Sequence, residues 1–464
     1  MVMEYSAYKD TGIPWLGEIP KEWDLLRNKF FLNEQKETVG ENSADYELLS
    51  LTLRGVVKRD IAGGKGKFPA SFDKYKKVRK GDIAFCLFDM DETPRTVGLS
   101  PYDGMLTGAY DIFSVQNINS SYLYYYYVAL DNVKALKPLY TGLRKTIPIN
   151  SFLAAKMPVP SPEEQAQIVR VLDWQISKIN KAIRNIRSEI DLLSEQKTAL
   201  ISKVVFNGTR NCEPTERDIF GWKVTIPEHW KSVKFNHCFS FGKGLAITKA
   251  NLVEEGIPVI SYGQIHSKMN SGTRLDETLF RFVSEEYLTK NPAALVNKGD
   301  FIFADTSEDL EGVGNATFVD QQMTLFAGYH TVIARPFSDE SSKYLAYLFK
   351  TPEWRKQIRP LVNRVKVYSI TQKILKMAYV ILLPEEEQEE ITDYLDSHCE
   401  RFDICIDRLS RQIGILEEYK KRILLDTVTG KVDVRNVDVP DYQHMEDEDV
   451  DEEFDDSDIV DEEN

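Results

Sequence analysis

The sequence predicts a mixed α/β fold in which two similar globular modules are joined by two long antiparallel coiled-coil helices, with an approximate internal two-fold axis. Three observations lead to this fold class. Short motifs of the first half return in the second half, each half ends in a long heptad pattern, and short apolar runs separated by Gly and Pro precede each pattern. The predicted segments are a first module (1–160), a first long helix (161–207), a second module (208–383), a second long helix (384–430) and a C-terminal segment with an acidic tail (431–464).

The internal repeat is the strongest of these signals. Ile19–Trp23 (IPKEW) returns as Ile226–Trp230 (IPEHW), 207 residues later, and Glu164–Gln165 returns as Glu387–Gln388, 223 residues later. A period above 200 residues is too long for a solenoid repeat. The growing offset indicates that the second copy gains residues in its first two-thirds. We therefore expect two modules that recognise different things and share one frame.

The short strands of the modules are predicted from apolar runs that Gly and Pro bound on either side. Examples in the first module are 47–51 and 82–87, and in the second module 257–261 and 301–303. Segments 121–136 and 341–359 are predicted to be helical, each ending near a proline. On the first of these helices we expect the tyrosine cluster 124–127 to belong to core and interface rather than to a stacking platform.

The two long helices are predicted from capping and periodicity. Ser161–Glu164 (SPEE) is typical of a capping box, with serine at N-cap, proline at N1 and a glutamate at N3 that reaches back to the serine N–H. Apolar residues then follow at alternating spacings of three and four over more than five heptads, and they return with an offset of 223, which favours a coiled-coil seam over two helices on separate cores. The predicted seam consists of Leu172, Ile179, Ile183, Ile186, Ile190 and Leu193 in the first helix and Leu395, Phe402, Ile406, Leu409, Ile413 and Leu416 in the second.

An antiparallel pairing would place the two modules at opposite ends of a rod. Aligning the two heptad windows end to end sets Lys197 against Leu395 and Lys420 against Leu172, with both ammonium groups reaching water near the rod ends. About 40 residues at 1.5 Å each give a rod of about 60 Å, the length of about 18 base pairs.

The net charge of −15 hides two different regions. From Asp438 to the end there are 15 acidic residues and no Lys or Arg, so residues 1–437 carry 58 basic and 58 acidic side chains. The tail has the composition of a solvated disordered segment, and the alternative is a mimic of DNA charge directed at this chain or at a partner.

Basic residues gather in three short stretches of the balanced body. Residues 54–80 contain ten against two acids, residues 134–156 contain five and residues 354–376 contain seven, the last two without any acid. Clustered Lys and Arg are what contact with phosphate groups requires.

Motifs for catalysis or metal binding are weak. The five cysteines are scattered without a C-x-x-C, which argues against a disulfide framework or zinc cluster and suits a reducing cytoplasm. The glycine-rich run 63–67 lacks the Lys-Ser/Thr of a P-loop, 241–244 resembles a glycine motif for S-adenosylmethionine without a βαβ pattern, and the acids of 305–311 form a common acidic loop. We expect no catalytic residue, no metal site, no signal peptide and no membrane span, and hence a cytoplasmic protein.

Four segments together resemble a known family, the specificity (S) subunits of type I restriction–modification systems. They are Asp10–Trp23 (DTGIPWLGEIPKEW), Glu255–Ile260 (EGIPVI), Pro160–Ile168 (PSPEEQAQI) and Thr429–Val434 (TGKVDV). The resemblance implies target recognition domains at 1–160 and 208–383 that each read half of a bipartite site in double-stranded DNA. It also implies that the long helices set the spacing and dock two methyltransferase subunits, with restriction–translocase subunits joining this core.

In such a complex the chemistry belongs to the partners, so S-adenosylmethionine, ATP and Mg²⁺ are expected there, with no cofactor in this chain. Two features depart from the family pattern. The second helix entry, Pro384–Gln388 (PEEEQ), lacks the proline pair of the first, and the acidic tail lies outside the pattern and leaves a regulatory role open.

The candidate DNA contacts follow from these stretches, with lysines suited to phosphate and Arg or Gln to base edges. They are Arg54, Lys58, Arg59, Lys65, Lys67, Lys74, Lys76, Lys77, Arg144 and Lys145 in the first module and Lys243, Lys249, Gln264, Lys268, Arg274, Arg364 and Lys366 in the second. Alternative interpretations are the specificity subunit of a methylation-only or type IIB-like assembly, and a coiled-coil interaction protein without a role on DNA. An enzyme in its own right has the least support.

Overall fold

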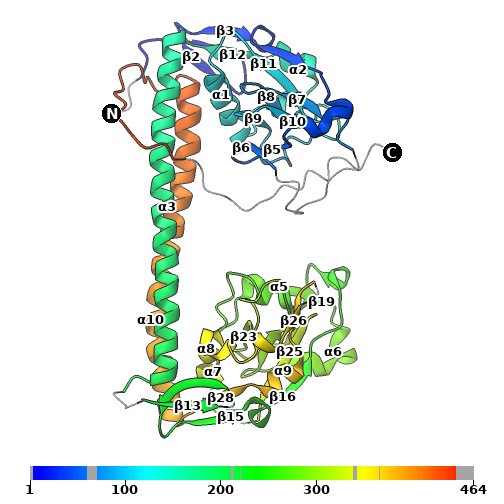
Figure 1. Cartoon of the computed structure of the whole chain (residues 1–464), viewed down its shortest axis with the longest axis vertical. Coiled ribbons are helices and arrows are strands. Elements are labelled where there is room, and N and C mark those ends of the chain that lie inside the picture. Colours follow the sequence, from blue (N-terminus) through cyan, green and yellow to red (C-terminus); the bar gives the residue numbers. More distant parts are fainter. Residues whose placement is uncertain are drawn as a thin grey trace. The chain divides into compact units, whose positions relative to one another are not determined.

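The structure is a computed structural model that describes residues 4–59, 71–210, 214–219, 221–337, 342–364 and 366–445 (Figure 1). It divides into two compact units, Met1–Ser188 with Leu409–Asn464, and Glu189–Arg408. Each unit contains one globular module and a stretch of both long helices, α3 (Pro162–Asn207) and α10 (Glu385–Val428). The predicted fold class, mixed α/β with two similar modules and a pair of long helices, is confirmed.

The module of the first unit contains short strands and two short helices. Its elements are β1 (Tyr8–Asp10), β2 (Glu18–Pro20), β3 (Asp24–Arg27), β4 (Leu32–Gln35), β5 (Leu49–Thr52), β6 (Gly55–Lys58), β7 (Lys76–Val78), β8 (Ile83–Phe85), β9 (Val97–Leu99), β10 (Gly104–Leu106), β11 (Asp111–Val115), α1 (Ser120–Asn132), α2 (Ile149–Ala154) and β12 (Lys156–Val159).

The module of the second unit follows the same order with additions. Its elements are β13 (Pro214–Ile219), β14 (Trp222–Pro227), β15 (Lys231–Lys234), α4 (Phe235–Cys238), β16 (Phe239–Lys243), β17 (Leu252–Val253), β18 (Ile257–Ile260), α5 (Tyr262–Ile265), β19 (Arg281–Val283), α6 (Tyr287–Lys290), β20 (Leu295–Val296), β21 (Phe301–Ala304), β22 (Thr306–Ser307), β23 (Ala316–Phe318), β24 (Leu325–Ala327), β25 (Thr331–Pro336), α7 (Ser342–Lys350), α8 (Pro352–Arg355), β26 (Asn363–Arg364), β27 (Tyr368–Ser369), α9 (Gln372–Met377) and β28 (Tyr379–Leu382).

The internal repeat is visible in the sheets. The first module has an antiparallel sheet of order β4-β11-β8-β9, and the second has the equivalent order β16-β25-β21-β23. In both modules a strand near the start pairs with the last strand, β3 with β12 and β15 with β28. The outer sheets differ, because the first module has the two-stranded pairs β5-β6 and β7-β10 where the second module has a five-stranded sheet, β17-β19-β18-β24-β20. The residues that the second copy gains therefore enlarge the outer sheet and leave the repeated sheet unchanged.

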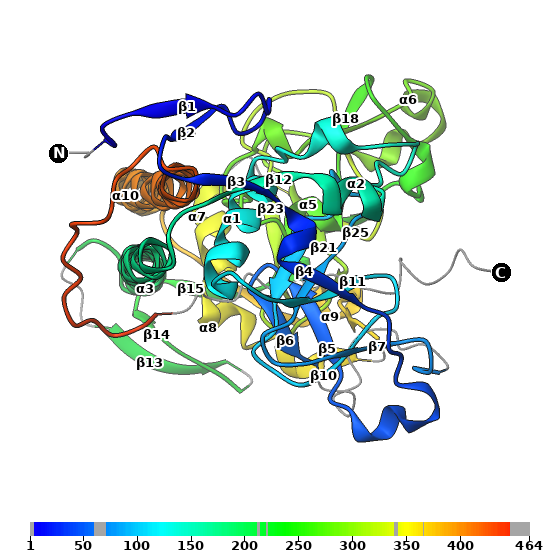
Figure 2. The same cartoon turned by 90° about the horizontal axis from the view of Figure 1, so that it is seen from above.

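Within each unit the stretches of the two long helices lie side by side and antiparallel (Figures 1 and 2). In the first unit Lys420 Nζ donates to Asn180 Oδ1 at 3.0 Å, and in the second unit Lys197 Nζ contacts Asp403 Oδ1 at 2.5 Å. The predicted register, with Lys420 at Leu172 and Lys197 at Leu395, is wrong by about two helical turns. The two leucines are fully buried inside the module cores and do not face the lysine stems.

The predicted seam residues are buried or half-buried, whereas most of their neighbours on the same helices are exposed. Burial is deepest at the module ends, at Leu172 and Leu395, and it decreases toward the middle of each helix, where Ile190 and Leu409 are half-buried. A two-helix pair without a third layer leaves its seam partly open to water, and this explains the gradient.

The predicted capping box at the start of α3 forms only in part. The backbone N–H of Glu164 donates to Ser161 Oγ at 3.3 Å, as predicted. The Glu164 carboxylate, however, accepts the hydroxyl of Tyr5 at 2.6 Å and does not bind the serine N–H. The N-terminal segment therefore takes over the second half of the cap and ties itself to the helix.

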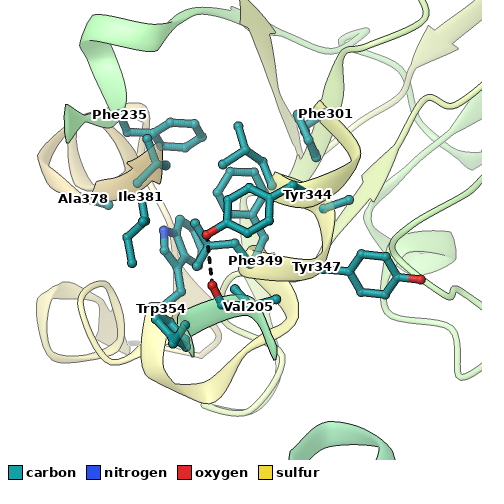
Figure 3. Packing of buried hydrophobic residues seen from close by; sticks show 14 of the residues in the cluster. Val205, Phe235, Phe301, Tyr344, Tyr347, Phe349, Trp354, Ala378 and Ile381 are labelled. Carbon is teal, nitrogen blue, oxygen red and sulfur yellow. Dashed lines mark hydrogen bonds between the residues drawn. The ribbon is translucent and has the colours of Figure 1, made fainter. Parts of the chain in front are cut away.

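Buried tyrosines hold the C-terminal ends of both long helices. The last carbonyls of an α-helix lack partners within the helix, and burying them unpaired costs free energy. Tyr344 on α7 donates its hydroxyl to the carbonyl of Val205 at 3.1 Å (Figure 3). Tyr122 on α1 is the equivalent residue and donates to the carbonyls of Pro158 at 3.0 Å and Val428 at 3.4 Å. The first module thus holds the end of α10, which follows the second module in the sequence. The second module holds the end of α3, which follows the first.

A second tether joins the same module helices to the sides of the long helices. Tyr347 Oη donates to Asp396 Oδ1 at 2.6 Å, and Tyr125, its equivalent, donates to Asp173. Burial raises the pKa of both phenols above the ordinary value, so they remain donors. As predicted, the cluster 124–127 lies in the core and against α3, with Tyr126 and Tyr127 buried.

The predicted single helix over 341–359 is wrong, because the structure has two helices there. The α7 helix ends at Lys350, and α8 begins at Pro352 after Thr351, whose side chain accepts from the N–H of Trp354. Proline at N1 and threonine at N-cap start a new helix and cannot continue the old one. The break turns Trp354 into the core, where it packs against Phe349 (Figure 3).

We expect Tyr344→Phe to lower the free energy of unfolding by about 1–3 kcal/mol, because the carbonyl of Val205 would remain buried without its donor. Urea titration of the full chain, followed by tryptophan fluorescence, measures the change. Tyr419→Phe is the control, since Tyr419 is half exposed on α10 and its change should lie within about 0.5 kcal/mol. Equal effects of the two substitutions would contradict the capping role.

Two glycines of the α10 region should respond to alanine with opposite signs. Gly430 follows α10 with φ +75°, and a Cβ there would lie 2.3 Å from Pro20 Cδ, so Gly430→Ala should destabilise the chain by about 2–4 kcal/mol. Gly414 lies inside α10 with nothing near its Cβ position, so Gly414→Ala should stabilise it by about 0.5–1 kcal/mol. Thermal unfolding of both variants tests this. A stabilising Gly430→Ala would refute the left-handed helix end.

Candidate nucleic-acid interface

The first group of predicted DNA contacts lies on the β5–β6 hairpin. Arg54 occupies the exposed turn, where its backbone N–H donates to Thr52 Oγ1 at 3.2 Å. Lys58 follows on β6, pairs with Glu47 at 3.1 Å and places its ammonium 5.3 Å from the ring centre of Tyr102. Arg59 is half-buried at the end of this hairpin. The hairpin therefore presents a guanidinium at its tip and a lysine over an aromatic ring on its side.

The lysines around β7 divide into structural and surface residues. Lys76 donates to the carbonyl of Tyr110 at 2.6 Å and lies 3.5 Å from Asp111, so it holds β7 to the neighbouring loop. Lys77 pairs with Glu37 at 2.5 Å, and this hydrogen bond lowers the pKa of the glutamate. Lys74 is exposed, whereas Lys65 and Lys67 lie outside the described residues.

The loop that carries Arg144 and Lys145 is already neutralised by an acidic loop. Arg144 binds Asp89 through Nε and Nη2, at 3.2 and 2.8 Å. Lys145 contacts Asp91 at 3.1 Å and Glu92 at 2.7 Å, and its hydrogen bond is the main cause of the lowered pKa of Asp91. A phosphate or base that binds here must replace carboxylates that are in place.

The predicted contacts of the second module are more open. The charged side chains of Lys243, Lys249, Lys268 and Arg274 are exposed and form no ion pair within the described part of the chain. Gln264 instead completes a capping box of α5, since its Oε1 accepts the N–H of Ser261 at 3.1 Å. Reading a base with this amide would require the cap to open.

Lys366 lies in the turn of a small hairpin. Its strands β26 and β27 pair with each other, and β27 pairs with β22. The backbone of Arg364 belongs to β26, and its side chain lies outside the described residues. Lys366 is exposed and is carried by a three-stranded sheet rather than by a free loop.

An aromatic cluster beside this small sheet was missed by the sequence reasoning. The ring of Tyr262 meets those of His330 at 5.4 Å, Tyr329 at 5.6 Å and His266 at 6.3 Å. His266 contacts the carbonyl of Thr306 in β22 through Nε2 at 2.7 Å. Aromatic rings next to basic side chains suit nucleic-acid contact by stacking. The Tyr-His pair at 329–330 was visible in the sequence, but only the fold brings Tyr262 to it.

Not every cation of the basic stretches faces outward. Lys350 and Arg355 line a cavity of about 120 Å³ with Asn270 and Asn315. Lys350 Nζ donates to the carbonyl of Ser271 at 2.6 Å. Burial lowers the pKa of Lys350 to about 8 and that of Arg355 to about 10. Arg355, in the basic stretch 354–376, and Lys350 just before that stretch therefore support the module from within.

Comparison with known proteins agrees with this architecture. Residues 227–413 match the family described as "Type I restriction modification DNA specificity domain". The specificity subunit of the type I restriction enzyme MjaVIII from Methanocaldococcus jannaschii is 24% identical over 290 residues, which cover 62% of this chain and 64% of that protein. The chain thus matches somewhat less than two-thirds of the length of this relative.

Two solved structures are similar to the whole chain. A chain from a study titled "Structural basis underlying complex assembly and conformational transition of the type I R-M system" has a TM-score of 0.60 at 16% identity, over 89% of this chain and 99% of that one. The HsdS subunit from Thermoanaerobacter tengcongensis has a TM-score of 0.43 at 17% identity, over 93% of this chain and all of that one. The chain is thus similar to type I restriction–modification specificity subunits, by a family match over residues 227–413 and by a relative that is 24% identical.

Neither a membrane-spanning helix nor a metal-binding group occurs among the described residues. None of the helices there is long and apolar enough to cross a membrane. In the same part of the chain, His, Cys, Asp and Glu side chains form no group of three that could hold a metal ion.

The buried ammonium of Lys350 should make stability depend on pH. Its pKa is about 8 in the folded chain and near 10.5 when unfolded, so the unfolded state binds more protons between these values and stability rises with pH. We expect Lys350→Met to be more stable relative to the parent at pH 7 than at pH 10, by up to about 3 kcal/mol. Urea titrations at both pH values measure this, and a difference independent of pH would show that the amine titrates normally.

Proposed function

We propose that this chain is the DNA-recognition subunit of a type I restriction–modification complex, in which each module reads one half of a bipartite target. The matched family model and the similar specificity subunit support a role in DNA recognition. The chain matches only 64% of the length of that subunit, so the activity and the partners are inferred. The single observation that carries the bipartite reading is the duplicated sheet, β4-β11-β8-β9 and β16-β25-β21-β23, with unlike outer sheets attached to each copy. A common frame with divergent outer parts is what two readers of different half-sites require.

The candidate contacts lie on these divergent parts. Arg54 is carried by the β5–β6 hairpin, which has its counterpart in the five-stranded sheet of the second module. Lys366 is carried by the small sheet next to the Tyr262 cluster. Lysines would bind phosphate, whereas arginine is suited to bidentate contact with guanine.

The long helices would serve as a spacer and a docking site. In this proposal the antiparallel pair separates the two modules by a fixed distance along the duplex, and its outer faces bind methyltransferase subunits, two by the internal symmetry. Restriction–translocase subunits would join that assembly. The subunits that this chain recruits would supply methyl transfer and ATP-driven cleavage, with S-adenosylmethionine, ATP and Mg²⁺ bound there.

The first test is to find the target. Mapping methylated adenines in the host genome, with and without this gene, should reveal one bipartite motif that disappears with the gene. A motif that persists would remove the proposed function.

The second test separates the two modules on that target. In the complex with its methyltransferase, Arg54→Ala should weaken binding about ten-fold on the intact site and little on DNA whose first half-site is scrambled. Lys366→Ala should show the reverse dependence. Lys231→Ala is the control, because Lys231 is exposed on β15 in the repeated frame. Losses that do not depend on which half-site is intact would contradict two independent readers, and binding insensitive to salt would contradict phosphate contact.

A further inference from the structure

The chain beyond α10 is bound to the first unit as a strap, which we define as residues 431–445. Gln167 on α3 donates its amide to the carbonyls of Val434 at 3.0 Å and Val437 at 2.7 Å. Val434 is buried in the core of the first unit, and Val437 packs against it. The strap therefore leaves the end of α10 along a defined path on α3.

Two buried polar side chains of α3 hold the end of the strap. Ser177 Oγ accepts the backbone N–H of Met445 at 3.2 Å, and Asn180 Nδ2 donates to the Met445 carbonyl at 3.0 Å. Asn180 Oδ1 also accepts from Lys420 Nζ at 3.0 Å. Met445, the last described residue, therefore lies beside Lys420 of α10, and the densest acidic run of the sequence follows it.

Met445 lies on the wall of a cleft of about 430 Å³ in the first unit. The cleft is lined by the Arg54 hairpin, by α1 and α10, and by His444 and Met445 of the strap. Its charged lining is mostly basic, with Arg54, Arg95, Lys420 and Lys421 against Glu417. Of these cations, Arg95 also pairs with Asp131 at 3.3 Å and Lys421 with Glu418 at 2.8 Å. Apolar atoms of Tyr102, Tyr124 and Val57 fill much of the remaining wall.

Residues 446–464 match this cleft in two respects. They contain 13 acidic residues and no basic one, opposite in sign to the cleft. They also contain Val450 and Phe454, within nine residues of Met445, and an extended chain of that length reaches about 30 Å. Apolar side chains separated by carboxylates suit a cleft with an aromatic wall and a basic rim.

We propose that the acidic segment 446–464 binds back into the cleft beside the Arg54 hairpin and competes there with DNA. The occupant is tethered, so its effective concentration at the cleft is of the order of millimolar, and even weak affinity gives high occupancy. The competition with DNA rests on the proposed function, whereas the docking does not. Competition by the acidic segment would make the first module release non-target DNA more readily than the second module does.

Docking is tested without DNA on the intact chain. A zero-length carbodiimide cross-linker should join carboxylates of 446–464 to Lys420 or Lys421, as read by mass spectrometry, and the yield should fall as salt is raised. Cross-links of equal yield to Lys231, or none from the acidic segment, would overturn the proposal. The variant Arg54→Ala with Lys421→Ala should lower the remaining Lys420 cross-link, with Lys231→Ala as the matched control.

Competition is tested in the methyltransferase complex. Replacing the 13 acids by Asn and Gln should raise affinity for DNA about five- to ten-fold at low salt, only when the first half-site is intact, and the gain should shrink as salt is raised. If the acidic segment docks but the complex does not bind DNA, the proposed function is wrong and the docking stands. If the complex binds DNA and replacing the 13 acids leaves its affinity unchanged, the acidic segment does not compete with DNA and the proposed function stands.

Discussion

The two long helices end inside hydrophobic cores, and this creates a constraint that the rest of the structure must meet. The last carbonyls of a helix need donors, and a core without water supplies none unless a side chain is placed there. Tyr122 and Tyr344 are these donors, fully buried and at equivalent places in the repeat. Each tyrosine donates to the end of the long helix that follows the other module in the sequence. Each core therefore needs residues from both copies of the repeat. The end of α3 thus completes the core of the second unit, and the end of α10 completes the core of the first.

The same constraint explains which parts of the repeat can differ. The sheet, the module helix and the two tyrosine tethers position the ends of α3 and α10, so both copies retain them. Neither of the two tyrosines belongs to an outer sheet, since Tyr122 lies on α1 and Tyr344 on α7. They differ in strand number and carry the Arg54 hairpin in one module and the aromatic cluster around Tyr262 in the other. Under the proposed function, the outer sheets would set the selectivity, and changes there would leave the shared sheet and the tyrosine contacts intact.

Several cations of the candidate interface in the first module, such as Lys58, Arg144 and Lys145, are paired with carboxylates before any nucleic acid binds. Exposed pairs such as Arg144 with Asp89 contribute less than about 1 kcal/mol, so exchanging the carboxylate for a phosphate costs little. Such pairing keeps basic loops ordered and favours binding that depends on salt. The proposed docking of the acidic segment 446–464 would extend this principle from single side chains to the cleft beside the Arg54 hairpin.

The sequence by itself determined the repeat, the two long helices and the mixed α/β class, because these depend on local periodicity, caps and motif spacing. It also determined that Tyr125 and its neighbours belong to a core. Only the tertiary structure decided the helix register, because contacts with the module cores at Leu172 and Leu395 outweigh an even alignment of heptads. It likewise decided that Glu164 binds Tyr5, that Lys76 and Lys350 are structural, and that Tyr262 meets His330. Those facts depend on residues far apart in the chain, and no local pattern records which distant side chain completes a hydrogen bond or covers a charge.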